Sequence, residues 1–141
     1  MIHLIEEIKH KTHVATEEAV RLALGEVIGA YAIVVLSKNE PNKMIAARKG
    51  SSIAAGSGKD ESFIASDATP MVDYTKNVAY LNDGEVATID NGKLTVKTID
   101  NETKIPFVQE LELKLEAIEK GGYDHFMMKE IYQQPQTISD C

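Results

Sequence analysis

The stretch Gly29-Ala-Tyr-Ala-Ile-Val-Val-Leu36 decides how the rest of the chain is interpreted. A glycine there follows a helical pattern, and the residues after it carry no charge as far as Leu36. A short apolar run with β-branched residues and turn signals at its ends is typical of a strand buried on both faces. Such a strand needs a layer of structure on each side. We therefore expect the segments around it to supply those layers in an α+β domain.

Length and composition restrict the possible classes of protein. The 141 residues suit a single domain, which we predict to span 1–141, and 43% hydrophobic with 26% charged residues is ordinary globular composition. The net charge of -7 argues against a nucleic-acid partner, because phosphate binding needs a basic face. No apolar run approaches the roughly 18 residues of a membrane span, and no signal peptide pattern opens the chain. We therefore expect a cytoplasmic protein that binds neither nucleic acid nor membrane.

Two helices are predicted before the central stretch. Isoleucines recur every three residues among charged residues from Met1 to Lys11, which indicates a short amphipathic helix. Thr16 is the expected N-cap of a second helix, with Glu17 and Glu18 in the first turn, where the helix dipole favours acidic groups. Gly29 is expected to end this helix.

Most of the following chain predicts antiparallel strands. Lys43 to Arg48 is expected to form a hairpin with the central stretch, and Ser62 to Ser66 a further strand. The glycine-rich residues 50–58 between them are too small to favour a core strand. Asp67 is expected to cap a short helix that contains Pro70.

Turn residues predict a meander in the second half of the chain. Asn82-Asp83-Gly84 and Asp90-Asn91-Gly92 are the residues that tight hairpin turns require, and they separate three short apolar segments. Further on, leucines alternating with charged residues predict a strand, and a helix is expected over Phe126 to Gln133. The leucines are Leu111, Leu113 and Leu115, and the residues expected to join the core from that helix are Phe126, Met127 and Ile131.

No constellation of residues carries chemistry by itself. His3, His10 and His13 lie close in sequence but lack a further metal ligand, so we interpret them as surface residues. The glycines before Lys59 fail the phosphate-loop pattern, because Asp60 stands where serine or threonine is required.

Ser66, Asp67 and His125 have the residue types of a hydrolase triad, but helix capping by Ser66 or Asp67 explains the first two better. Four other residues with reactive side chains occur at turns or at the chain end without an activating neighbour. We therefore predict no catalytic, cofactor-binding or metal-binding residue and no cofactor. Those four residues are Asp73, Asp83, Glu85 and Cys141.

Several stretches together carry a family resemblance over nearly the whole chain. They are the central stretch, Glu18-Ala-Val-Arg-Leu-Ala-Leu24, Ala46-Ala-Arg-Lys-Gly-Ser51, Phe63-Ile-Ala-Ser-Asp-Ala-Thr-Pro70, Tyr80-Leu-Asn-Asp-Gly-Glu85 and Gly121-Gly-Tyr-Asp-His-Phe-Met-Met-Lys-Glu-Ile-Tyr-Gln-Gln-Pro135. In this order they resemble the glutaminase domain of the isomerizing glutamine–fructose-6-phosphate aminotransferases, also called glucosamine-6-phosphate synthases. The last stretch is the most specific, since it is similar to the end of that domain, before the sugar-phosphate isomerase half.

The resemblance implies part of a four-layer αββα sandwich of the N-terminal-nucleophile type, the class II glutamine amidotransferase fold, with mostly antiparallel strands. In that family an N-terminal cysteine attacks the side-chain amide of glutamine, with its own α-amine as base. The released ammonia aminates fructose 6-phosphate in the downstream isomerase domain. This sequence begins Met1-Ile2, so we expect the nucleophile and the glutamine-holding residues to fall upstream.

The resemblance therefore predicts the C-terminal portion of a glutaminase domain, inactive alone. The alternative is a non-catalytic binding or regulatory module on the same scaffold. An amidotransferase that aminates another acceptor is a third interpretation, and the stretch Gly121 to Pro135 argues against it.

Uncovered sheet faces and strand edges predict a homo-oligomer. The sequence departs from the family pattern where proline or larger apolar residues are expected, at Ser52, Ala54, Ala55, Ser57 and Ser62.

Overall fold

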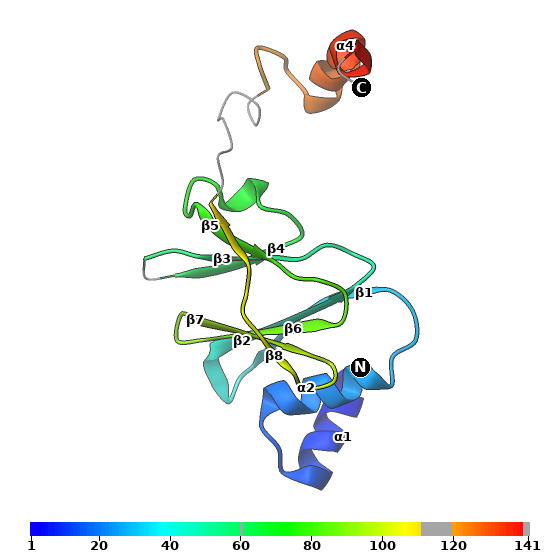
Figure 1. The fold of residues 1–141 in the computed structure, drawn as a ribbon, viewed down its shortest axis with the longest axis vertical. Coiled ribbons are helices and arrows are strands. Elements are labelled where there is room, and N and C mark those ends of the chain that lie inside the picture. The colour runs from blue at the N-terminus through cyan, green and yellow to red at the C-terminus, as the bar shows by residue number, and fades with distance from the viewer. Residues whose placement is uncertain (60, 111–119, 140–141) are drawn as a thin grey trace. The chain divides into compact units, whose positions relative to one another are not determined.

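The computed structural model describes residues 1–59, 61–110 and 120–139, and the chain divides into two compact units, Met1–Leu111 and Glu112–Cys141. The first unit contains two helices and two antiparallel sheets (Figure 1). The second unit contains one helix in its described part. None of the helices in the described ranges has the length and apolar character that a membrane span requires.

The first two helices are α1 (Ile2–Thr12) and α2 (Thr16–Gly25), which confirms the amphipathic pattern near the N-terminus. Thr16 is not the N-cap, because Ala15 occupies that position with extended backbone and makes no capping bond through its side chain. The second helix also ends before Gly29. The N–H groups of Glu26 and Val27 bond back three residues, which tightens and closes the last turn.

Sheet A has the strand order β1-β2-β6-β7-β8, with every neighbouring pair antiparallel. The predicted hairpin between the central stretch and the following strand is confirmed, and it turns at Lys38 and Asn39. The bounds of the five strands are β1 Tyr31–Ser37, β2 Glu40–Lys49, β6 Glu85–Asp90, β7 Lys93–Thr98 and β8 Thr103–Lys104.

Sheet B has the order β4-β3-β5-β9, also antiparallel. Its strands are β3 Ala54–Ser57, β4 Ser62–Ala65, β5 Asn77–Tyr80 and β9 Val108–Glu110. The glycine-rich stretch, judged too thin for a core strand, contains the inner strand β3. The N-cap of the short helix η1 (Thr69–Met71) is Ala68, so the prediction that Asp67 caps it is wrong, although Asp67 accepts a hydrogen bond from the Thr69 N–H at 2.7 Å from the position before the cap.

The central stretch forms an edge strand, so the prediction that it is buried on both faces is wrong. Tyr31, Ile33 and Val35 are half-buried against the helices. Val34 and Leu36 point the other way and are 48% and 69% exposed. The apolar run is covered on one face only because β1 lies at the end of sheet A.

The predicted meander is correct only in its second turn. β6 and β7 pair around Asn91 and Gly92, which have the positive φ angles of 49° and 79° that such a turn demands. β5 and β6, however, belong to different sheets. The residues 82–84 therefore form a crossover between sheets, and turn chemistry alone does not distinguish a crossover from a hairpin.

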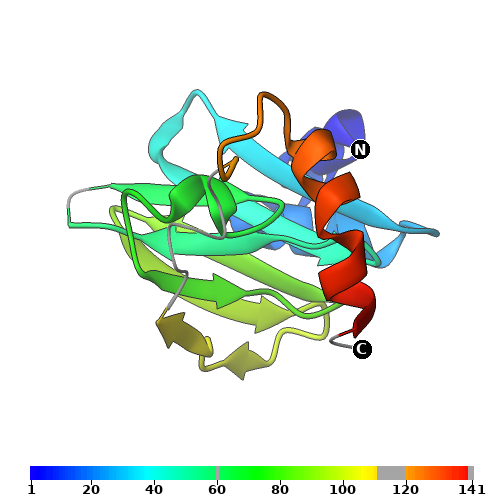
Figure 2. The ribbon, with the colours of Figure 1, turned by 90° about the horizontal axis from the view of Figure 1, so that it is seen from above.

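The core of the first unit lies in two main layers. One lies between the helices and sheet A, where Ile45, Ala47 and Val86 pack against α1 and α2. The other lies between the sheets and includes Ala46, Ala87, Val96, Ile53 and Leu81. The order of the layers is helices, sheet A, sheet B (Figure 1), which corresponds to three of the four layers of an αββα sandwich. Figure 2 views the two sheets from above, so that they overlap.

The second unit contains α4 (Phe126–Ser139), which confirms the predicted helix and extends it through Pro135. Tyr123 and Tyr132 stack with ring centroids 5.6 Å apart. The prediction that this helix contributes core residues is wrong within the described part, because Phe126, Met127 and Ile131 are 52%, 67% and 53% exposed. The strand predicted over Leu111, Leu113 and Leu115 lies outside the described residues.

Gly56 on β3 is closely covered, and we expect Gly56→Ala to lower the free energy of unfolding by about 1–3 kcal/mol. A Cβ there would lie 2.8 Å from Met71 Sδ and 2.8 Å from Thr75 Cγ2. Thr75 cannot move aside easily, because its hydroxyl donates to the Ser57 carbonyl at 2.6 Å and accepts from the Asn77 N–H at 3.0 Å.

The matched control is Gly25→Ala at the end of α2, where a Cβ meets nothing within 4 Å. This change should be neutral or stabilising, since alanine is the better helix former. Urea denaturation followed by circular dichroism measures both variants. Equal stability of the two would contradict the close packing of η1 on sheet B.

Candidate functional site

Arg48 and Asp83 tie together the two crossovers between the sheets. Arg48, near the end of β2, donates from Nε and Nη2 to Asp83 Oδ1 at 3.0 and 2.7 Å, and from Nη1 to the Leu81 carbonyl at 3.1 Å. Asp83 also accepts the Gly50 N–H at 3.0 Å. These bonds lower the pKa of Asp83, with the Gly50 bond the largest cause. Asp83, which the sequence placed at a turn, therefore links the connection between β2 and β3 to the connection between β5 and β6.

A second charged cluster joins the helices to β2. Glu40 accepts from Lys43 at 2.6 Å and from the Thr16 hydroxyl, while Lys9 donates to Thr16 and lies 3.5 Å from Glu40. Lys43 also donates to Glu17 at 3.0 Å. The bonds from Lys43 and then Thr16 lower the pKa of Glu40 to about 2. We call these five residues the Glu40 cluster.

Thr16 thus has a different role from the predicted cap, since its hydroxyl bonds to Glu40 across 24 residues of sequence. Lys43 is the lysine of the cluster that bonds to both acids. Bonds to Glu40 and then Glu17 raise the pKa of Lys43. Sequence analysis missed the cluster, because its members come from three separate elements and no local spacing joins them.

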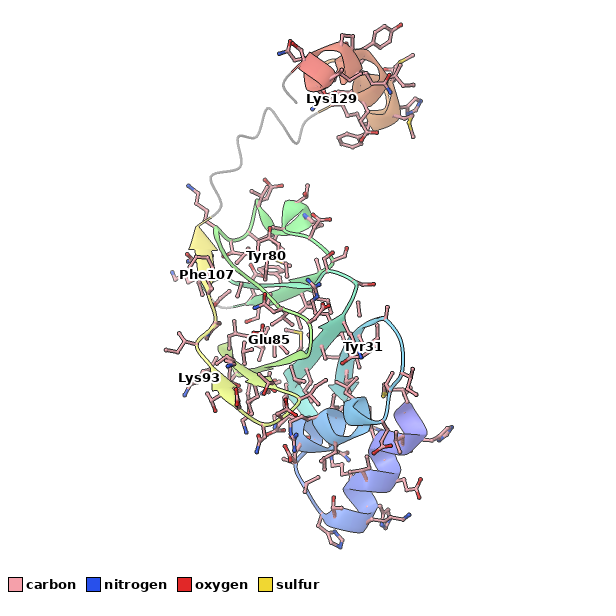
Figure 3. The ribbon with its side chains drawn as sticks, turned by 45° about the vertical axis from the view of Figure 1, so that its right-hand side comes forward. Tyr31, Tyr80, Glu85, Lys93, Phe107 and Lys129 are labelled. Carbon is pink, nitrogen blue, oxygen red and sulfur yellow. The ribbon has the colours of Figure 1, made fainter. Side chains whose placement is uncertain are left out.

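Tyr31 opens β1 and carries a buried hydroxyl (Figure 3). This oxygen has no hydrogen-bond partner among the described residues. Burial, and then the charge of Asp83, raise the pKa of the Tyr31 phenol. The neutral hydroxyl therefore persists through ordinary pH.

Two hollows mark the surface of the first unit. The larger, about 780 Å³, lies between α1 and β1, and we call it the α1–β1 hollow. The other, about 720 Å³, is lined by turns at one end of the two sheets, including Asn42, Ser57 and Asn91. Its lining is mixed: neutral polar, apolar and glycine residues line it together with the charged Lys59 and Glu61.

The residues considered as candidate sites from the sequence form no common site, and several of them make structural hydrogen bonds. His10 and His13 line the α1–β1 hollow. Groups of three or more histidine, cysteine or acidic residues suited to a metal do not occur in the described ranges. Asp67 binds the η1 backbone, and the carbonyl of His125 accepts from the N–H groups that open α4. Glu85 accepts from the Asn82 N–H at 2.8 Å, and Cys141 lies outside the described residues.

Comparison with known sequences identifies relatives that carry the same name. The chain is 54% identical over its full length to a glutamine–fructose-6-phosphate aminotransferase [isomerizing] of Bacteroides thetaiotaomicron. It is 50% identical over 99% of its length to that of Chlorobaculum tepidum, and 41% identical over 99% to that of Pyrococcus horikoshii. This chain is homologous to a segment of the glutamine–fructose-6-phosphate aminotransferases. It spans 23% of the length of each of these relatives, and no protein-family model matches it.

The aminotransferase relationship agrees with the fold. A solved structure of glutamine phosphoribosylpyrophosphate (PRPP) amidotransferase from B. subtilis, complexed with ADP and GMP, superposes with a TM-score of 0.55 at 20% identity. The match covers 70% of this chain and 21% of that one. The fold is therefore that of the N-terminal-nucleophile amidotransferases, α+β with mostly antiparallel strands, as the resemblance implied.

Protonation of Glu40 should weaken the first unit at low pH. Because the folded pKa of about 2 lies below the ordinary 4.5, the stabilisation is complete above pH 4.5 and is lost as pH falls toward 2. Glu40→Gln should cost about 1–2 kcal/mol at neutral pH, less than full linkage implies, since the carboxylate is partly exposed. Thermal unfolding of both proteins at several pH values measures the difference, which should shrink below pH 4.5.

Glu102→Gln is the control for this titration. Glu102 pairs with Lys104 at 3.0 Å but is 67% exposed, so its loss should change stability by less than about 0.5 kcal/mol. A pH-independent difference between wild type and Glu40→Gln would disprove the linkage.

Tyr31→Phe should leave the first unit as stable or raise the free energy of unfolding by up to about 1 kcal/mol. The change removes a buried hydroxyl that has no partner in the described structure and keeps the ring against the helices. Differential scanning calorimetry measures the effect. A clear loss of stability would show that the hydroxyl makes a favourable bond in solution.

Proposed function

We propose that this chain is part of a glutamine-dependent aminotransferase that converts fructose 6-phosphate to glucosamine 6-phosphate. The observation that carries the proposal is 54% identity over the full chain to a protein named for that activity. An amidotransferase fold in an independent structural comparison supports it. The chain would act in the cytoplasm beside a sugar-phosphate isomerase domain.

Within that enzyme we assign this chain the C-terminal portion of the glutaminase domain. Hydrolysis of the glutamine amide requires a nucleophile within hydrogen-bond reach of a base. We assign neither role to the described residues, because the Thr16 hydroxyl that donates to Glu40 also accepts from Lys9, and Lys43 donates to the same carboxylate, which ties both groups into an ion-pair cluster that connects elements. The chain would therefore hold the sandwich in shape, and no catalytic, cofactor-binding or metal-binding role is assigned to its residues.

The second candidate is a non-catalytic binding or regulatory module on the same scaffold. The α1–β1 hollow favours it, because about 780 Å³ lined by both apolar and charged side chains is large enough for a small metabolite. This candidate predicts saturable binding to the 141-residue chain, with no turnover of glutamine.

A glutaminase assay distinguishes the two candidates. The 141-residue chain should release no ammonia from glutamine. A chimaera that places the preceding segment of the Bacteroides thetaiotaomicron relative, with a free N-terminal cysteine, before Met1 should release it. The control is the same chimaera with that cysteine replaced by alanine, which should be inactive but equally folded.

Activity in the short chain would contradict the assignment of the nucleophile to another segment. A folded chimaera without activity would favour the binding module, and calorimetric titration with glucosamine 6-phosphate and glutamine would then test it.

A further inference from the structure

Glycine follows one of the six asparagines of this chain, Asn91. The backbone nitrogen of the residue after an asparagine can attack its side-chain amide carbon, and glycine allows the closest approach because it has no side chain. The other five asparagines precede residues that carry one. Asn91 and Gly92 are exposed at the turn between β6 and β7, and a Cβ built on Gly92 would meet nothing within 4 Å. The turn is therefore open around the two groups that would react.

The attacking nitrogen must also be free of hydrogen bonds, because a bonded N–H has to give up its partner before it reacts. The Gly92 N–H donates to none of the described residues. Asn101 provides the contrast at another exposed turn. The nitrogen that follows it, in Glu102, donates to Thr98 Oγ1 at 3.1 Å. The structure thus separates two asparagines that differ in whether the next nitrogen is held.

Asp83-Gly84 is the other place where glycine follows a side chain that a backbone nitrogen attacks in this way, and here the structure holds both reacting groups. The Gly84 N–H donates to the Arg48 carbonyl at 3.0 Å. The Asp83 carboxylate accepts from the Arg48 guanidinium at 2.7 and 3.0 Å and from the Gly50 N–H at 3.0 Å. The two pairs are alike in sequence, but the pair at Asn91 is unrestrained at its attacking nitrogen.

We propose that Asn91 is a site of spontaneous deamidation. The Gly92 nitrogen forms a bond to Asn91 Cγ, and its proton leaves with the side-chain nitrogen as ammonia. Water then opens the resulting succinimide ring at one carbonyl or the other, which gives aspartate or isoaspartate. One water enters and one ammonia leaves, and the reaction requires no enzyme, oxidant or reductant. It is independent of the function proposed above.

The contacts of Asn91 indicate what the modification changes. Its side-chain nitrogen donates to Asp90 Oδ1 at 2.7 Å, and its backbone N–H donates to the Asn42 carbonyl at 3.2 Å. The attack requires the exposed side chain to rotate away from Asp90, and the aspartate formed would face that carboxylate as a like charge. Isoaspartate adds a carbon atom to the main chain of the two-residue turn, whose length fixes the pairing of Asp90 with Lys93. The modified hairpin should therefore be less stable at this end.

Peptide mapping by mass spectrometry tests the proposal on the folded 141-residue chain, incubated for several weeks in mildly alkaline buffer. Trypsin releases residues 77–93 as one peptide, which contains Asn77, Asn82 and Asn91 and so compares them directly. Asn91 should deamidate several-fold faster than each other asparagine, and electron-transfer fragmentation should show isoaspartate as well as aspartate there. Asp83 should not isomerise detectably. An unincubated sample digested in parallel corrects for reaction during the digestion.

A pair of variants tests whether the free nitrogen selects the site. Glu102→Gly places glycine after Asn101 while the next nitrogen keeps its bond to Thr98 Oγ1, so Asn101 should still react several-fold more slowly than Asn91. Adding Thr98→Val removes that acceptor and should raise the Asn101 rate several-fold. Circular dichroism checks that both variants are folded, and the Asn91 rate in each serves as the internal reference.

Deamidation of Asn91 no faster than that of the other asparagines would overturn the proposal. So would an Asn101 rate in Glu102→Gly that equals the Asn91 rate with Thr98 intact, because the sequence pair alone would then determine the reaction. A faster Asn91 in the wild type, with Asn101 slow in Glu102→Gly and faster after Thr98→Val, would establish both the site and its structural cause.

Discussion

Burial of β2 and β6 on both faces is the constraint on which the rest of the first unit depends. Ile45 and Ala47 of β2 face the helices, while Ala46 between them faces the second sheet. Ala46 lies opposite Ala87 of β6, and both are fully buried. Small side chains at this pair let the second sheet approach closely, and larger ones would separate the layers. The stack of helices and sheets follows from this pair of strands.

Ion pairs then set how the layers connect. The Arg48–Asp83 pair holds the crossover after β5 against the crossover after β2, so each chain reversal enters the correct sheet. The Glu40 cluster connects α1 and α2 to the start of β2 at the other end of that strand. The bonds of the Glu40 cluster are partly buried, where charge-assisted bonds are stronger than at an open surface, whereas Asp83 is 57% exposed. The charged residues of this chain thus serve its architecture.

The sequence comparison and the fold comparison agree with each other. The homology to glutamine–fructose-6-phosphate aminotransferases extends over the whole chain, while the fold is shared with a PRPP amidotransferase at only 20% identity. Similar layers at low identity are expected when packing requires only apolar residues of suitable size at alternating positions.

Local patterns by themselves determined the helices α1 and α4 and the β1–β2 and β6–β7 hairpins, because each depends on residues close in sequence. The family resemblance correctly implied the fold. Only the tertiary structure decided that β1 is an edge and β2 a buried inner strand, since the charged Lys43 and Arg48 of β2 hide its burial until their partners are known. It also decided that residues 82–84 cross between sheets and that Thr16 binds Glu40. These features depend on contacts between distant segments, and no spacing along the chain encodes them.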